Sequence, residues 1–214
     1  MTPSIGRTDY LYFRLERYLL ILLSGRLGSN PVLGHGQGGG ARHAWHAVND
    51  RNLPDFSIIT PGGKDAPFSE HNGFSITSGD DWLGQVASAI MNGPDWRSTV
   101  LFITWDDCGC FYDQVRPGVN PDGTVQGPRS PLNIVSPFAK SGFTDTTSTS
   151  FTGILSFTEH NFGLSPLGPN DAQAYPFTNA FNFRQAPLRP ARMIYRKWPR
   201  DAYHVNLAEG RDDT

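Results

Sequence analysis

Apolar and polar positions in the middle of the chain alternate in ways that predict a strand, a helix and a second strand. Residues 55–60 read DFSIIT, a β-branched run that a Pro-Gly-Gly turn closes, which is typical of a buried strand. A helix follows, which Ser78 or Asp80 caps and Gly93 ends. Its apolar face comprises Leu83, Val86, Ala87 and Ile90. Residues 99–105 are apolar nearly throughout, as expected of a strand covered on both faces.

Two further elements follow a turn-rich excursion. Residues 132–136, LNIVS, predict a third strand, and residues 150–163 predict a second helix, capped by Thr149 or Ser150 and ended by Gly163. The apolar face of that helix comprises Phe151, Ile154, Leu155, Thr158 and Phe162. The order strand, helix, strand, strand, helix predicts an α/β sheet with crossover helices.

The N-terminal part gives weaker signals. Residues 10–23 predict a helix, and its apolar part, 18–23, is far shorter than the roughly 20 residues that span a bilayer, so no transmembrane helix is expected. No convincing secretory signal is visible. Residues 25–40 are glycine-rich and predict a flexible join. His43 and His46 have a helical i, i+3 spacing that suits either a metal site or two surface histidines.

Composition narrows the class of protein. The chain has 214 residues, enough for one large domain, and 23 glycines and 17 prolines predict many loops. A net charge of -2 without any basic run argues against a nucleic-acid partner or a polybasic membrane anchor. A disulfide between Cys108 and Cys110 would close a very small strained ring, so free thiols are expected.

Candidate chemistry stands at the end of the second strand, where Asp106 and Asp107 follow the apolar run directly. In open α/β sheets ligands bind at the carboxyl ends of strands. Two neighbouring carboxylates repel each other unless a proton or a cation lies between them, and a hard divalent cation is the usual solution. The alternative is a solvated turn in which one aspartate accepts hydrogen bonds from nearby amides.

Two further side chains are candidates for the same edge. His71 lies in the loop after the first strand and could bind a metal, hold a phosphoryl oxygen or transfer a proton; it could also be a surface hydrogen-bonding group. Arg129 could bind an anionic oxygen of a substrate with its forked guanidinium, although loop arginines mostly lie in solvent. Asp113 and Arg116 are expected near the same edge.

Several motifs together carry a resemblance to a known family. They read, in order, LPDFSIITPGG, SEH, GDDWLGQVASAIMNGPDW, STVLFITWDDCGCFYDQVRP, GPRSP, LNIVSPFAKSG and FTGILSFTEHNFGL, and FNF with a following Gln185 and Pro187 closes the series. Over residues 53–190 the chain resembles the C-terminal half of the bacterial phosphoesterase family, which contains phospholipases C and acid phosphatases.

The resemblance implies an α/β fold of the alkaline-phosphatase-like α/β/α sandwich type and hydrolysis of phosphate-ester or phospholipid substrates. It further implies that Asp106 and Asp107 bind a divalent metal cation and that His71 belongs to the same phosphate-binding centre as a catalytic residue. Such a cation polarises a phosphoryl oxygen. Family members are commonly exported, but the sequence leaves localisation, the identity of the metal and the oligomeric state open.

Departures from the family pattern limit these expectations. The family reads Asp-His-Val where this chain has Gln114 in the middle position, and an amide donates hydrogen bonds but shuttles no proton. Cys110 replaces the usual glycine of the turn. The family's Glu-Asn metal motif, near E-N-R-S-F-D, and its Ser or Thr nucleophile have no counterpart in residues 1–52.

The predicted organisation is therefore a divergent, partly flexible segment over residues 1–52, the C-terminal part of a phosphoesterase domain over 53–190, and a tail over 191–214. The sheet is expected to lack N-terminal strands and to expose an edge. Three functions stay open: a metal-assisted phosphoric ester hydrolase, a catalytically silent truncated remnant that retains anion or metal binding, and an interaction module.

Overall fold

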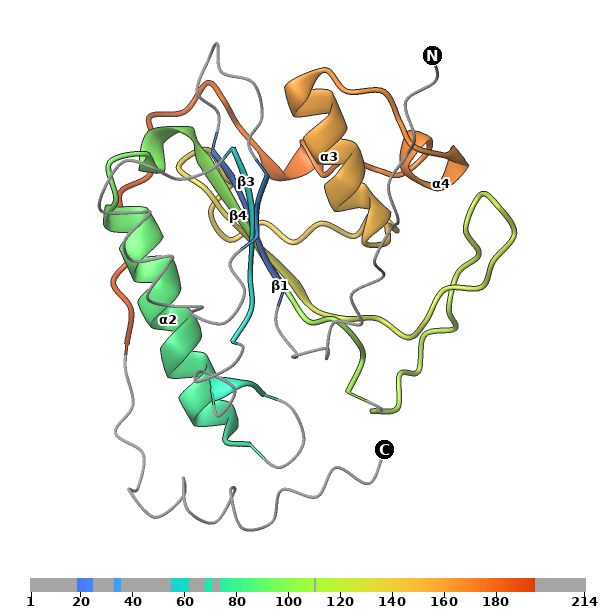
Figure 1. Cartoon of the computed structure of the whole chain (residues 1–214), viewed down its shortest axis with the longest axis horizontal. Helices are drawn as coiled ribbons and strands as arrows, with labels where there is room; N and C mark the ends of the chain where they lie inside the picture. Colours follow the sequence, from blue (N-terminus) through green and yellow to red (C-terminus); the bar gives the residue numbers. More distant parts are fainter. Residues whose placement is uncertain are drawn as a thin grey trace, which may run out of the picture.

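The computed structural model contains one mixed sheet (Figure 1). It describes residues 55–61, 68–70, 74–109 and 111–194, together with the backbone of strands β1 (Leu19–Ser24) and β2 (Leu33–His35). The other described strands are β3 (Phe56–Ile59), β4 (Thr99–Thr104) and β5 (Leu132–Val135), and the strand order is β2-β3-β1-β4-β5. The three strands predicted from the sequence are thereby confirmed.

Strand β1 pairs antiparallel with both β3 and β4, so these two strands run in the same direction. Their carboxyl ends therefore lie at one edge of the sheet, with helix α2 (Ile76–Asn92) in the connection between them. β2 is parallel to β3, and β5 is antiparallel to β4. A sheet with connecting helices agrees with the predicted α/β class, although most strand pairs are antiparallel.

The helix predicted over residues 10–23 is wrong for residues 19–23, which form β1. These residues read LLILL, and such an uninterrupted apolar run fits a helix and a central strand equally well. Pairing with two neighbouring strands satisfies its backbone polar groups and decides for the strand. The predicted flexible join over 25–40 likewise contains β2. Residues 10–18, with His43 and His46, lie outside the described residues.

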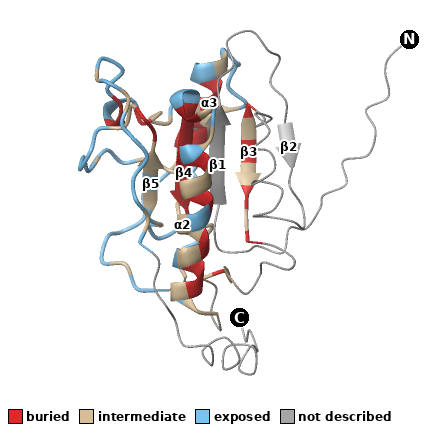
Figure 2. Ribbon diagram, turned by 90° about the vertical axis from the view of Figure 1, so that its left-hand side faces the viewer, coloured by how far each residue is buried: buried red, intermediate tan, exposed pale blue. Residues whose placement is uncertain are grey.

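The core lies on both faces of β4, whose residues are all buried. Leu101 and Ile103 belong to an apolar cluster with α2, whereas Val100 and Phe102 belong to a second cluster with helix α3 (Thr152–Phe162). This is the alternation that a strand imposes on successive side chains. Figures 1 and 2 show α2 and α3 on opposite faces of the sheet, which explains the continuous apolar run of β4.

Both helices end where predicted, but neither begins as predicted. Helix α2 is capped by Ser75, whose hydroxyl accepts a hydrogen bond from the Ser78 backbone N–H at 3.3 Å. Ser78 therefore lies inside the first turn, and Asp80 is further along the helix. Gly93 follows the last residue of α2, and Gly163 ends α3 with a φ of 66°, which favours glycine.

At α3 the predicted caps Thr149 and Ser150 are both wrong, because the N-cap is Phe151, which makes no side-chain capping bond. Instead the Ser150 hydroxyl pairs with that of Thr152 at 2.6 Å. Phe151 is exposed rather than part of the apolar face, since it precedes the first helical turn. Ile154 and Thr158 are buried as predicted.

Segments without regular structure are held by specific hydrogen bonds. The Gln185 side-chain amide donates to the carbonyl oxygens of Pro137 and Ala139, at 3.2 and 3.0 Å. The Trp96 indole N–H donates to the Leu188 carbonyl oxygen at 3.2 Å. These contacts fix the closing FNF segment beside the end of β5.

The remaining short elements are η2 (Trp96–Ser98), α4 (Pro169–Ala172) and η3 (Thr178–Ala180). Among the described residues, no helix has the length and apolar character to cross a membrane.

Two buried carboxyl groups join α3 to the start of α4. Asp171 accepts hydrogen bonds from the backbone N–H groups of Leu167 and Gly168, at 2.6 and 2.9 Å. Burial opposes its ionisation, but these bonds outweigh burial and hold the pKa of Asp171 below its usual value. Burial and the neighbouring Asp171 carboxylate raise the pKa of Glu159. The pair therefore favours a protonated Glu159 beside an ionised Asp171.

This pair predicts a stability optimum at mildly acidic pH. The contribution of Asp171 to the free energy of unfolding is present above the ordinary aspartate pKa and is lost as pH falls through its lowered pKa. The contribution of Glu159 is lost as pH rises through its raised pKa. Glu159→Gln, whose side chain stays neutral, is expected to remove the loss of stability that the wild type shows as the pH rises. The measurement is the urea midpoint between about pH 2 and pH 9, a range that extends below the ordinary aspartate pKa and above a glutamate pKa raised by burial.

Asp80→Asn on the exposed part of α2 is the matched control for the pH experiment, and it should leave the pH profile of the wild type unchanged. If wild type and Glu159→Gln lose stability in parallel as the pH rises, the protonated pair does not exist.

Candidate functional site

The candidate site lies at the carboxyl end of β4, where Asp106 and Asp107 follow the strand as predicted. The strand end is fixed because the Thr104 hydroxyl donates to the Pro131 carbonyl oxygen at 2.8 Å, next to the start of β5. The two carboxylates differ in environment. Asp106 is half-buried and its Oδ1 atom is shielded from solvent, whereas Asp107 is exposed.

Asp107 takes part in a tight turn. Its Oδ1 atom accepts a hydrogen bond from the Gly109 backbone N–H, and Gly109 has a φ of 66°, in the left-handed region. In the alternative to metal binding, an aspartate of the turn accepts hydrogen bonds from nearby amides, and Asp107 does so here. Only one of its two carboxylate oxygens is used. Cys108 is a half-buried free thiol, in agreement with the prediction, and Cys110 lies outside the described residues.

A hydrogen bond joins the end of β4 to the loop after β3. The Trp105 indole N–H donates to Oε2 of Glu70 at 2.9 Å. Trp105 is the residue before Asp106, and Glu70 is the residue before His71. The bond therefore joins the two segments that carry the predicted site residues. His71 itself lies outside the described residues, so its predicted role stays a prediction.

Asp113 and Arg129 form a forked ion pair. Nε and Nη2 of Arg129 each donate to one carboxylate oxygen of Asp113 at 2.8 Å, and the Arg129 backbone N–H donates to the same carboxylate at 3.1 Å. The Val115 N–H adds a fourth bond at 2.9 Å. The bonds from Arg129, followed by that from Val115, hold the pKa of Asp113 far below its usual value. The pair closes the base of the excursion between β4 and β5.

The ion pair changes the interpretation of Arg129. Asp113 occupies the edge of its guanidinium that Nε and Nη2 form, although the side chain is 62% exposed. Substrate binding by Arg129 stays a prediction, and it requires the remaining Nη1 or release of Asp113. Gln114, at the position of the family's histidine, is exposed and directly follows Asp113.

The excursion continues as a small hairpin that contacts α4. Val119 and Val125 form an isolated antiparallel bridge. At the tip, the Asp122 backbone N–H donates to Oδ1 of Asn170 at 3.1 Å, and the Asn170 side-chain N–H donates back to Asp122 Oδ2 at 2.8 Å. The loop after the aspartates is therefore held at both its base and its tip.

Oxygen donors of Asp106 and Asp107 fit a hard divalent cation in chemical type. In the part of the chain that the structure describes, no group of three or more His, Cys, Asp or Glu side chains is placed to hold a metal ion. By themselves these two carboxylates would supply only part of the coordination shell of such a cation. Carboxylates of this kind accept several hard cations, so they do not select one metal.

Sequence reasoning missed the bond between Trp105 and Glu70. Neither residue belongs to a periodic pattern that points to the other, and 35 residues separate them. The available signal was positional, because each directly precedes a predicted site residue. Asp113 and Arg129 were both singled out, but their mutual pairing was not predicted.

The described residues thus form an α/β domain with an acidic pair at the end of a strand. Comparison with known proteins shows the family to which the chain belongs. The sequence model of the Phosphoesterase family matches residues 33–165, which is more than half of the chain. The chain belongs to this family, and the resemblance seen in its motifs is confirmed. The match includes β3, α2, β4 and β5.

Among curated proteins, the relatives are phospholipases C. The chain is 31% identical over 171 residues to non-hemolytic phospholipase C of Burkholderia pseudomallei, a match that covers 64% of this chain and 24% of the relative. It is 28% identical over 177 residues to non-hemolytic phospholipase C of Pseudomonas aeruginosa, covering 65% and 25%. Non-specific phospholipase C6 of Arabidopsis thaliana is 31% identical over 109 residues, covering 42% and 21%. The matches span about a quarter of the length of these relatives.

Proposed function

We propose that the chain is part of a metal-assisted phosphoric ester hydrolase of the phospholipase C type, which acts on a phosphate-ester or phospholipid substrate. The observation that carries this proposal is the bond between Trp105 and Glu70 at 2.9 Å. It brings the segment before His71 to the strand end that carries Asp106 and Asp107. Membership of the Phosphoesterase family and relatives that are named phospholipases C support the reaction class.

In this proposal Asp106 and Asp107 hold a divalent cation of unassigned identity. A bound cation of this kind supplies Lewis-acid stabilisation of charge on a phosphoryl oxygen. Asp106, whose Oδ1 is shielded from water, provides the stronger electrostatic contribution, because a charge is less screened when it is partly buried. Asp107 adds its second oxygen while the Gly109 N–H fixes the first.

His71 is proposed to contact the phosphoryl group as the catalytic histidine of the centre, and Arg129 to contact an anionic substrate oxygen. Gln114 replaces the family's histidine, so in this proposal it donates a hydrogen bond and transfers no proton. The segment that carries it is fixed by the ion pair of Asp113, which keeps the amide close to the base of the loop.

The proposed fold of the complete catalytic unit is the alkaline-phosphatase-like α/β/α sandwich, with residues 53–190 as its C-terminal part. Support comes from helices on both faces of the sheet and from β3 and β4, which run in the same direction (Figure 1). That architecture places ligands at the carboxyl ends of the strands. Asp106 and Asp107 have this position.

The test is release of p-nitrophenol from p-nitrophenyl phosphate and from p-nitrophenyl phosphorylcholine. Turnover is expected with added divalent cations such as Mg²⁺, Ca²⁺, Mn²⁺ or Zn²⁺, and is expected to disappear with excess chelator. A folded far-UV spectrum without turnover at any cation concentration would contradict a hydrolase. Binding of a divalent cation without turnover, followed by calorimetry, would then favour the catalytically silent form.

A further inference from the structure

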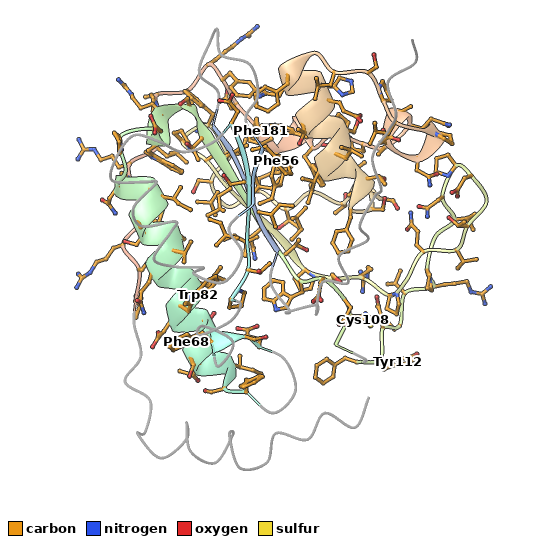
Figure 3. The ribbon with its side chains drawn as sticks, in the orientation of Figure 1. Phe56, Phe68, Trp82, Cys108, Tyr112 and Phe181 are labelled. Atoms are coloured by element: carbon orange, nitrogen blue, oxygen red, sulfur yellow. The ribbon has the colours of Figure 1, made fainter. Side chains whose placement is uncertain are left out.

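Two aromatic side chains project into solvent close to the acidic pair. Phe111 is 74% exposed and Tyr112 is 91% exposed, and they follow Asp107 by four and five residues. Figure 3 shows Tyr112 at the outer bend of the loop that also carries Cys108, on the side of the sheet where β4 ends. Exposure of two adjacent aromatic rings is unusual, because each forgoes the burial of a large apolar area.

Hydrogen bonds hold the chain at Phe111 and directly after Tyr112. The Phe111 N–H donates to the Cys108 carbonyl oxygen at 3.4 Å, and Asp113, the next residue after Tyr112, accepts four hydrogen bonds from Arg129 and Val115. A surface that binds with a fixed backbone loses little conformational entropy on contact. The hydrogen bonds at these described residues therefore lower the entropic cost of binding through the two rings.

Their position determines which partner they fit. Because Asp106 and Asp107 lie only a few positions earlier in the chain, any surface that contacts Phe111 and Tyr112 is brought close to the two aspartates. In a phospholipid layer the phosphoester lies in the headgroup region, directly above the acyl chains. Aromatic rings partition to this boundary, and an apolar surface that binds there enters by about 5–10 Å. Tyr112 adds a hydroxyl suited to the polar side of the boundary.

We propose that Phe111 and Tyr112 form a lipid-contact surface, which docks the acidic pair onto the phosphoester layer of a phospholipid bilayer. This inference rests on the proposed function, since it assigns the source of the substrate to an assembled lipid surface. Arg116, exposed in the same loop, adds a cation that faces lipid phosphates. The loop after β4 thus joins the substrate surface to the reacting centre.

The test is co-sedimentation of the chain with phosphatidylcholine vesicles. Wild type is expected to bind, and the double variant Phe111→Ser with Tyr112→Ser is expected to lower the partition coefficient at least about tenfold, because two aromatic rings are lost from the boundary. Leu167→Ser, which removes a side chain that is 84% exposed beside α4, is the matched control and should bind like wild type. A third variant, Phe111→Trp with Tyr112→Trp, should retain binding. Far-UV spectra should be the same for all variants.

Several outcomes would overturn the lipid surface: no binding by wild type, undiminished binding by the serine double variant, or equal loss in Leu167→Ser. Self-association of wild type that the serine variant abolishes, without vesicle binding, would assign the rings to a second copy of the chain instead. Failure of the proposed function is separate. Vesicle binding that needs both rings, without hydrolysis of either nitrophenyl ester, contradicts the hydrolase alone, whereas ester hydrolysis without vesicle binding contradicts the lipid surface alone.

Discussion

Phe102→Ala is expected to lower the free energy of unfolding by about 3–5 kcal/mol, the range of a large buried aromatic side chain cut to alanine. Phe102 is fully buried in the middle of β4. Its ring meets that of Phe157 on α3 edge to face, with centroids 5.2 Å apart, and that of Phe177 at 5.6 Å. The truncation removes these contacts and leaves a cavity that a strand paired on both sides cannot close.

Urea denaturation followed by circular dichroism measures this change. Phe111→Ala is the matched control, because the same substitution at a 74% exposed ring should change stability by no more than about 0.5 kcal/mol. A loss below about 1 kcal/mol at Phe102 would mean that α3 does not cover this face of the sheet in solution.

The elements around this core could be predicted because the pattern of apolar residues within each segment is enough to indicate a strand or a helix. Strand β4 is apolar from Val100 to Ile103 without a break, which is expected where both faces are covered, and α2 repeats its apolar residues with the period of a helix. The prediction failed for β1, whose run LLILLS has no period. Its state depends on the two strands that it pairs with, and both are distant in sequence.

The candidate site shows the same division between local and long-range information. Asp106 and Asp107 could be named from the sequence, because they directly follow a buried strand. The fork between Asp113 and Arg129 could not, since these residues are 16 positions apart and their pairing depends on how the excursion closes on itself. The capping of α2 by Ser75 rather than Ser78 depends on the backbone conformation of one residue, with φ -81° and ψ 115°. Composition does not encode that choice.

Asp106→Asn is expected to lower kcat/KM for p-nitrophenyl phosphorylcholine at least about hundredfold at a fixed cation concentration. Substitutions of residues that only support metal ligands cost about 10-fold to 100-fold in activity or metal affinity, and loss of a proposed ligand charge should cost no less. Asp107→Asn should have a smaller effect, because Asp107 is exposed and one of its oxygens already accepts the Gly109 N–H. In both variants the cation concentration for half-maximal activity should rise.

The control for Asp106→Asn is a carboxylate at the opposite end of the same strand. Asp95 precedes β4 by four residues, and six strand residues of about 3.3 Å each place it roughly 20 Å from the proposed metal centre. Asp95→Asn should therefore leave both kcat/KM and the cation dependence unchanged. If Asp106→Asn keeps full turnover with the wild-type cation requirement, the carboxylate at the end of β4 is not a metal ligand. If Asp95→Asn loses as much activity, the effect reports on folding of β4 rather than on the centre at its carboxyl end.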